Sequence, residues 1–232
     1  MLQTSDSGWL QYFQANSAEP NLPWDDAYRL TGAERAVVLR SIQQFQLGEN
    51  AQGRRLLERA RVLGSDYLQT LRLFVREEQR HSAILGRFLS LHGARCLRQH
   101  WVDGVFHMIR GLAGLELCMR VLATAEVLAI PYYTALRDAT GSPLLRDICS
   151  RILEEEGAHL RFQAFTFGRC ESGRCVAARE IVHALHRWFL VATTVLVWIE
   201  HRLVFLAGGY SMQRVLDQGL AQYEAMVGPT LR

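Results

Sequence analysis

The chain has 232 residues, of which 49% are aliphatic or aromatic, enough for one large domain or two small ones with a substantial core. Its formal net charge is only +3, which gives no electrostatic footprint for nucleic acid. All 26 basic residues are arginine, which excludes Schiff-base lysine chemistry and a phosphate-binding P-loop.

The N-terminal residues 1–30, which include Trp9 and Trp24, are predicted to form a mostly irregular wrap. The start of the chain has neither the basic nor the apolar region of a secretory signal. Five cysteines occur, and Cys170 and Cys175 have no second pair beside them, so we do not expect a zinc ribbon. We expect a reducing, cytoplasmic location.

Helical periodicity dominates the rest of the chain, and strand signals are nearly absent. Thr31, followed three residues later by Glu34, has the pattern of a capping box at the start of a helix over 31–62. Ser65 is the predicted cap of a second helix, which ends near residue 92. Residues 97–110 are predicted to form either a short helix or an irregular crossover.

The second half of the chain repeats this organisation. A third helix is predicted over 111–138, and Ser142 and Pro143 are the predicted cap and first residue of a fourth that ends near 168. A very apolar fifth helix over 176–207 and a short sixth helix follow. Two helical hairpins joined by a longer link predict an all-α four-helix bundle with one long crossover. The bundle covers 31–168, with accessory helices over 169–232, in one domain.

The segment 188–199 is a run of twelve residues without a charge. A membrane span needs about 20 apolar residues, and charged residues border this run on both sides. We therefore expect a buried core helix and no membrane span.

Two short stretches carry the same motif, VREEQRH over 75–81 and LEEEGAH over 153–159. In each, two adjacent glutamates are followed by a histidine, so that Glu78 and His81, and Glu156 and His159, stand three residues apart. That spacing places a carboxylate and an imidazole on one face of a helix.

Each motif has a glutamate at the same height across its hairpin turn. Glu78 follows Gly64 by 14 residues and Glu49 precedes it by 15. Glu156 follows Gly141 by 15 residues and Glu126 precedes it by 15. At a rise of 1.5 Å per residue, each pair is level to within roughly 2 Å. Glu126 has mostly apolar neighbours, so we expect it to point into the bundle, where a metal cation would compensate the buried charge.

On these motifs the chain resembles the ferritin-like superfamily of carboxylate-bridged di-iron proteins. The resemblance implies a site for two iron ions, with an Mn/Fe pair as the alternative, and O2 as co-substrate. It also implies six metal ligands: Glu49, Glu78, His81, Glu126, Glu156 and His159. The motifs are further similar to those of bacterial multicomponent monooxygenases, which implies that Glu77 and Glu155 orient the ligand histidines through their ring N–H groups. Glu154 is expected to be a surface charge.

Departures from related families narrow the expected chemistry. Ferritins lack the second Glu-x-x-His motif, and rubrerythrins usually add a rubredoxin domain with paired cysteine motifs. Small subunits of ribonucleotide reductase usually carry a tyrosine where this chain has Leu85. The pattern is most similar to oxygenases and oxidases such as the aldehyde-deformylating oxygenases and the N-oxygenases.

Helical phase suggests residues around the expected metals. Gln46 and Gly53 share the face of Glu49. Gln46 is a candidate catalytic residue, and Gly53 would leave room beside the metals or simply allow close helix packing. Tyr133 shares the face of Glu126 and is a candidate donor of a proton or an electron, or else a core tyrosine. Pro131 is expected to kink its helix. His201 is an additional ligand or a substrate contact or, with better support, a structural residue.

Three functions follow as hypotheses. The first is an O2-activating oxygenase or oxidase that acts on a small hydrophobic or amphipathic molecule and receives electrons from a separate ferredoxin or reductase. The second is an iron-oxidising or peroxide-reducing protein, and the third is a bundle in which metal serves stability alone. A homodimer is possible because bundles this apolar often pair.

Overall fold

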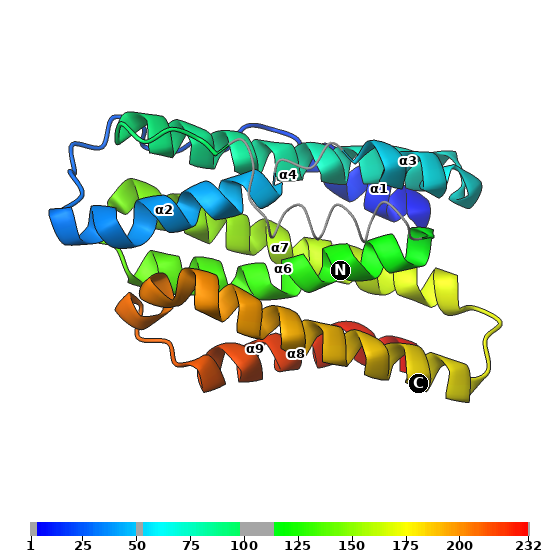
Figure 1. Ribbon diagram of the computed structural model, residues 1–232. Helices are drawn as coiled ribbons and strands as arrows, with labels where there is room; N and C mark the ends of the chain where they lie inside the picture. The colour runs from blue at the N-terminus through cyan, green and yellow to red at the C-terminus, as the bar shows by residue number, and fades with distance from the viewer. Residues whose placement is uncertain (1–3, 50–52, 98–113, 232) are drawn as a thin grey trace. The chain divides into compact units, whose positions relative to one another are not determined.

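The computed structural model describes residues 4–49, 53–97 and 114–231, and every regular element within these ranges is helical (Figure 1). The chain forms two compact units, Met1–Cys118 and Met119–Arg232. Most of the predicted crossover over 97–110 lies outside the described residues.

The first unit is organised around one long helix, α4, on which α1 and α2 pack (Figure 1). Tyr67, Leu71, Phe74 and Phe88 of α4 are all buried. This apolar face is what α1 and α2 cover, and it excludes water from the polar residues that α4 carries on the same side. The elements of this unit are α1 (Asp6–Ala15), α2 (Gly32–Glu49), α3 (Arg54–Ala60), a 3₁₀ turn (Arg61–Leu63) and α4 (Ser65–Leu91).

The N-terminal segment is more ordered than its sequence predicts. Most of residues 4–30 is irregular, as expected, but Asp6–Ala15 form α1. Ser5 caps this helix by accepting a hydrogen bond from the N–H of Gly8 at 3.1 Å. Trp9 and Phe13 stand four residues apart and are both buried. The ring of Phe13 meets that of Phe74 edge-on, so burial of these aromatic side chains on α4 stabilises a helix of only ten residues.

The single helix expected over 31–62 is also wrong. α2 begins as predicted: Glu34 accepts from the N–H of Thr31 at 2.8 Å, and Thr31 Oγ1 accepts from the N–H of Glu34 at 3.2 Å. However, α2 ends at Glu49, and α3 starts after Gly53, which adopts the left-handed conformation with φ +58°. Helical phase therefore does not extend from Glu49 to Gly53.

Gly53 has a local packing role. A Cβ placed there would lie 2.7 Å from Cγ2 of Val75, so the glycine leaves room for a side chain of α4. This contact supports the alternative of close helix packing, and the role of leaving room beside the metals stays a prediction. The predicted cap Ser65 is wrong as well, because α4 has no side-chain cap and Ser65 Oγ lies 3.2 Å from Asp66 Oδ1.

The second unit consists of four long helices, of which α9 packs against both α7 and α8. Ser142 caps α7 as predicted, accepting from the N–H of Leu145 at 3.2 Å, and α6 stays helical through Pro131. Gly208, just after α8, lies directly on the backbone of Ala135 in α6, where a Cβ would overlap the carbonyl oxygen. The bounds are α6 (Leu115–Asp138, whose first turn belongs to the first unit), α7 (Pro143–Glu171), α8 (Val176–Ala207) and α9 (Met212–Leu231).

Two predicted lengths in this unit are wrong. α7 continues to Glu171, three residues beyond the predicted end, because the Glu171 side chain is held by partners inside the unit. The sixth helix is not short: α9 has 20 residues, and its Tyr223, Met226 and Val227 are buried.

α8 has the predicted bounds but not the predicted burial. In the part of the chain that the structure describes, it is the one helix long and apolar enough to cross a membrane by length and composition. Only 33% of its most apolar stretch is buried, so the expectation of a buried core helix holds for one face alone. The other face is apolar too, and it exposes Ile181, Leu185, Trp188, Val195, Ile199, Leu203 and Leu206.

Candidate metal centre

The first unit buries one glutamate of α2 beside the Glu-x-x-His pair of α4. Glu49, Glu78 and His81 are 9%, 8% and 0% exposed. One donor atom from each of the three lies within 4.8 Å of the others. Within the motif, Nδ1 of His81 lies 3.9 Å from Oε1 of Glu78. Glu49 reaches this level although its helix stops there, because packing of α2 along α4 sets the register.

The second unit repeats the arrangement with tighter contacts. Glu126 of α6 and Glu156 and His159 of α7 are 2%, 1% and 0% exposed, and again one donor atom of each lies within 4.8 Å of the others. Nδ1 of His159 is 3.1 Å from Oε2 of Glu126 and 3.4 Å from Oε2 of Glu156. The expectation that Glu126 points into the protein is confirmed by its burial.

The buried acids and the histidine of the second unit perturb one another. Burial, and then the neighbouring Glu126 carboxylate, raise the pKa of Glu156 to about 8. Burial opposes protonation of His159, but the charge of Glu126 and its hydrogen bond raise the pKa of that imidazole well above its usual value. The group thus favours bound positive charge, which a divalent cation supplies in place of protons.

The donor set fits iron or manganese. Each unit offers carboxylate oxygens and one imidazole, which are ligands that these ions accept. Zinc or copper sites that are rich in sulfur use a different set of ligands. Three side chains in each unit also match the pattern of carboxylate-bridged sites in bundles, a Glu plus a Glu-x-x-His motif.

The acidic neighbours of the two motifs each bind an arginine of their own helix. Glu77 Oε1 lies 2.8 Å from Nη2 of Arg80, and Glu155 Oε1 lies 2.5 Å from Nη2 of Arg151. Glu77 and Glu155 are 4% and 5% exposed, so these ion pairs hold buried carboxylates next to the motifs. Orientation of the histidines by Glu77 and Glu155 stays a prediction. The Glu154 side chain is 73% exposed, as expected for a surface charge.

Gln46 is buried one turn before Glu49. Its Nε2 donates to Ser82 Oγ at 2.8 Å, and that hydroxyl donates to the backbone carbonyl of Gln46 at 3.0 Å. Since Ser82 follows His81, the pair ties α2 to α4 at the level of the Glu-x-x-His motif. A catalytic role for Gln46 stays a prediction.

Tyr133 is fully buried in α6, and its ring lies edge-on to Tyr132 with centroids 5.1 Å apart. Its role as a donor of protons or electrons stays a prediction. His201 of α8 packs its ring against Tyr132, with centroids 5.1 Å apart, which suits a structural residue.

Sequence reasoning missed a buried polar network in the second unit. The guanidinium of Arg120 pairs with Glu171, and its Nη1 lies 3.2 Å from Nδ1 of His186. His183 joins Glu171 Oε2 at 3.1 Å and Tyr223 Oη at 3.3 Å. The sequence does contain an indication of this network, because the polar residues His183 and His186 stand three residues apart on one face of α8.

The tautomer of His186 follows from its partners. Arg120 donates to Nδ1, and Thr124 Oγ1, whose proton goes to the carbonyl of Arg120, lies 3.0 Å from Nε2. Nε2 therefore carries the proton. Burial and the charge of Arg120 lower the pKa of His186 to about 3, and burial raises the pKa of Tyr223 to about 12.

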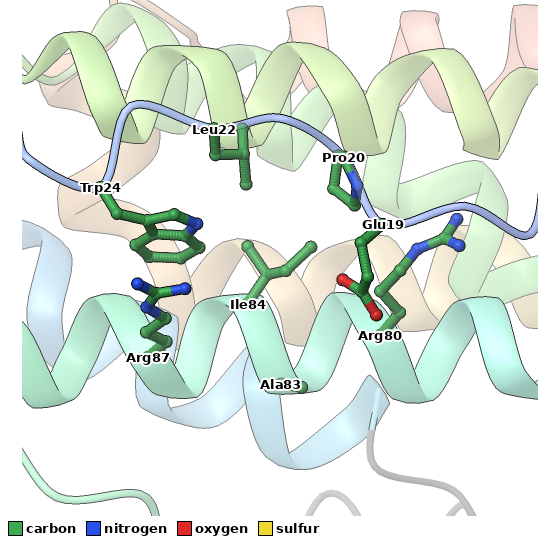
Figure 2. Close-up of a pocket in the computed structure, with 8 residues that line it drawn as sticks. All are labelled: Glu19, Pro20, Leu22, Trp24, Arg80, Ala83, Ile84 and Arg87. Atoms are coloured by element: carbon green, nitrogen blue, oxygen red, sulfur yellow. The ribbon is translucent and has the colours of Figure 1, made fainter.

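A surface pocket of about 160 Å³ lies between the N-terminal segment and α4 (Figure 2). Trp24 forms one end, with the guanidinium carbon of Arg87 3.9 Å from the centroid of its ring. Arg80 forms the other end; its Nη1 donates to the carbonyls of Asn16 and Ala18. The same guanidinium pairs with Glu77, so it connects the N-terminal segment to the motif of α4.

No family model matches this chain, and no curated protein matches it in sequence. Solved structures do. An R2-like ligand-binding oxidase, a valine-to-alanine mutant with an anaerobically reconstituted Mn/Fe cofactor, aligns with TM-score 0.64 and 17% identity, over 96% of this chain and 92% of that one. A valine-to-isoleucine mutant of such an oxidase, with an aerobically reconstituted Mn/Fe cofactor, aligns with TM-score 0.61 and 16% identity, over 96% and 93%. The predicted all-α, ferritin-like fold is confirmed by this similarity.

Proposed function

We propose that the chain is a non-haem, O2-activating oxidase or oxygenase whose two triads hold a pair of metal ions, Fe/Fe or Mn/Fe. The carrying observation is that each unit buries the same donor set, Glu49 with Glu78 and His81 in one and Glu126 with Glu156 and His159 in the other. Solved neighbours named for an Mn/Fe cofactor support the binding of two metals.

The chemistry that the metal pair supplies when bound is reduction of O2 and oxidation of a nearby organic molecule. The protein residues have separate tasks. The six side chains hold the ions, Arg80 and Arg151 neutralise the adjacent carboxylates, and the buried surroundings exclude water. Tyr133, buried in α6 seven residues after Glu126, is our candidate for transfer of a proton or an electron.

We further propose a small hydrophobic or amphipathic substrate and a separate electron donor, a ferredoxin or reductase. Two fully buried aromatic side chains, Phe162 and Phe167, follow the motif on α7, and they favour an apolar substrate. In this respect the proposal differs from iron storage, which needs no organic pocket.

The test is anaerobic loading with Fe(II), a metal count per chain, and rapid mixing with O2 while visible absorption is recorded. Two metals and fast oxidation that an amine, a fatty acid or an aldehyde accelerates support the proposal. Two metals without oxidation contradict it. Turnover of Fe(II) or H2O2 with no effect of any organic compound assigns the site to iron or peroxide handling instead.

A further inference from the structure

Gln163 of α7 is fully buried, and neither its Nε2 nor its Oε1 has a hydrogen-bond partner among the described residues. A buried amide without partners destabilises the folded state, and native proteins rarely keep one. The other buried glutamine among the described residues, Gln46, lacks a partner only for its Oε1, because its Nε2 donates to Ser82. The amide of Gln163 is thus open to a partner that the described residues do not supply.

The position of Gln163 places it next to the metal ligands of its own helix. It follows His159 by four residues and Glu156 by seven, so the three side chains share one face of α7. Four residues further along this face is Phe167, fully buried, with the guanidinium carbon of Arg120 4.6 Å from the centroid of its ring. The amide stands between polar ligands on one side and an aromatic ring on the other.

The internal repeat supplies a comparison. In the first unit the residue four positions after the motif histidine is Leu85, which is also fully buried. An apolar residue therefore suits this position of the motif, and packing alone does not require an amide. The polar side chain is a property of the second half only.

Other polar groups on α7 are engaged elsewhere. Thr166 Oγ1 donates to the carbonyl of Phe162 at 2.9 Å, and Nδ1 of His159 lies 3.1 Å from Glu126. Gln163 offers one acceptor and an NH2 donor side by side on a planar group. The complementary partner is a planar group that presents both a donor and an acceptor, as an amide does, whereas a carboxylate offers acceptors alone.

We propose that Gln163 binds the substrate directly, through paired hydrogen bonds to a carboxamide-type group such as an amide, a lactam or a urea. This inference rests on the proposed function and adds a substrate class to it. The apolar part of the molecule packs toward Phe167. Gln163 is then a specificity-determining residue rather than a metal ligand.

The experiment uses full-length protein loaded anaerobically with Fe(II), and octanamide, octanoate and nonane as probes in titration calorimetry. The near-isosteric variant is Gln163→Met, with Gln163→Leu as a second variant that copies Leu85. The matched control is Gln213→Leu, an exposed glutamine of α9. We expect wild type and the control to bind octanamide more tightly than octanoate or nonane.

In both Gln163 variants we expect the affinity for octanamide to fall by about 10-fold or more, the size of one to two net hydrogen bonds. The metal count stays unchanged, and the thermal midpoint stays equal or rises, because an unpaired amide has been removed. Unchanged affinity in the variants, no binding of octanamide by wild type, or a preference for octanoate or nonane overturns the inference.

The same samples separate this inference from the proposed function. Metal count and oxidation by O2 test the metal centre, and they do not depend on the probe. If both are normal while octanamide binds wild type and Gln163→Met equally, only the role of Gln163 is wrong. If metal does not bind but the probe still discriminates between the two chains, the proposed function is wrong and the amide contact stands.

Discussion

Nδ1 of His159 lies 3.1 Å from Oε2 of Glu126, although the two residues belong to different helices, 33 positions apart in the chain. This contact brings α6 and α7 to the same level and concentrates negative charge around one imidazole. A cation that enters there replaces a proton-dependent arrangement with direct ligation.

We therefore expect Glu126→Ala to weaken binding of Mn(II) or Fe(II) by at least about 100-fold, the upper end of what loss of an outer partner costs. Equilibrium dialysis measures the affinity, and a thermal scan with and without metal measures the accompanying loss of stabilisation. Glu154→Ala is the matched control, since that side chain is 73% exposed. Equal metal affinity in wild type and Glu126→Ala would remove Glu126 from the ligand set.

His186 gives a prediction about pH. Its pKa is about 3 in the folded state, against 6.5 for an ordinary histidine, because of burial and the charge of Arg120. Between these values the unfolded chain binds a proton that the folded chain does not, so this contribution to stability is complete above pH 6.5 and is lost as the pH falls toward 3. The total is at most about 5 kcal/mol.

The matched variant is His186→Gln, which can still accept from Arg120 and donate to Thr124 without titrating. Urea unfolding at several values between pH 6.5 and 5 should show a shallower loss of stability in the variant than in wild type. Parallel stability curves for the two chains would mean that His186 does not titrate as its surroundings indicate.

Two glycines near the end of α2 should respond in opposite ways to replacement by alanine. Gly53 has φ +58°, and a Cβ there would lie 2.7 Å from Val75, so Gly53→Ala should lower the free energy of unfolding by about 2 kcal/mol. Gly48 lies inside α2 with nothing within 4 Å, so Gly48→Ala should raise it by up to about 1 kcal/mol. Chemical denaturation measures both, and the same sign for the two would refute the distinction.

The capping box of α2 offers another matched pair. Thr31 Oγ1 accepts from the N–H of Glu34, so Thr31→Ala should cost about 1 kcal/mol. Ser65 begins α4 but makes no cap bond, so Ser65→Ala should change stability by less than about 0.5 kcal/mol. A larger loss at Ser65 than at Thr31 would contradict the assignment of the caps.

The parts of the fold that could be predicted are those governed by local pattern. The bounds of α8, the capping box of Thr31 and Glu34, and the cap Ser142 follow from helical periodicity and from hydrogen bonds within one turn. The burial of Glu126 also followed from its apolar neighbours. In each case the determining interactions lie within a few residues.

The incorrect predictions concern features that depend on contacts between residues far apart in the chain. α1 is stabilised by burial of Trp9 and Phe13 on α4, which no local pattern reports. The break before Gly53 depends on close approach to Val75, and the unmet amide of Gln163 is visible only once its surroundings are known. Likewise, apolar composition predicted a buried α8, because composition alone does not show which face a neighbouring helix covers.

The outer face of α8 carries an intrinsic fluorescent probe. Trp188 is 72% exposed on that face, whereas Trp9 is 2% exposed. Emission from an indole in water lies at longer wavelength than emission from a buried one, so anything that covers this face will shift the fluorescence of Trp188 to the blue and leave that of Trp9 unchanged. Subtracting the spectrum of a Trp188→Phe chain isolates this signal. The fluorescence of Trp188 then shows whether the outer face of α8 is covered, without an attached dye.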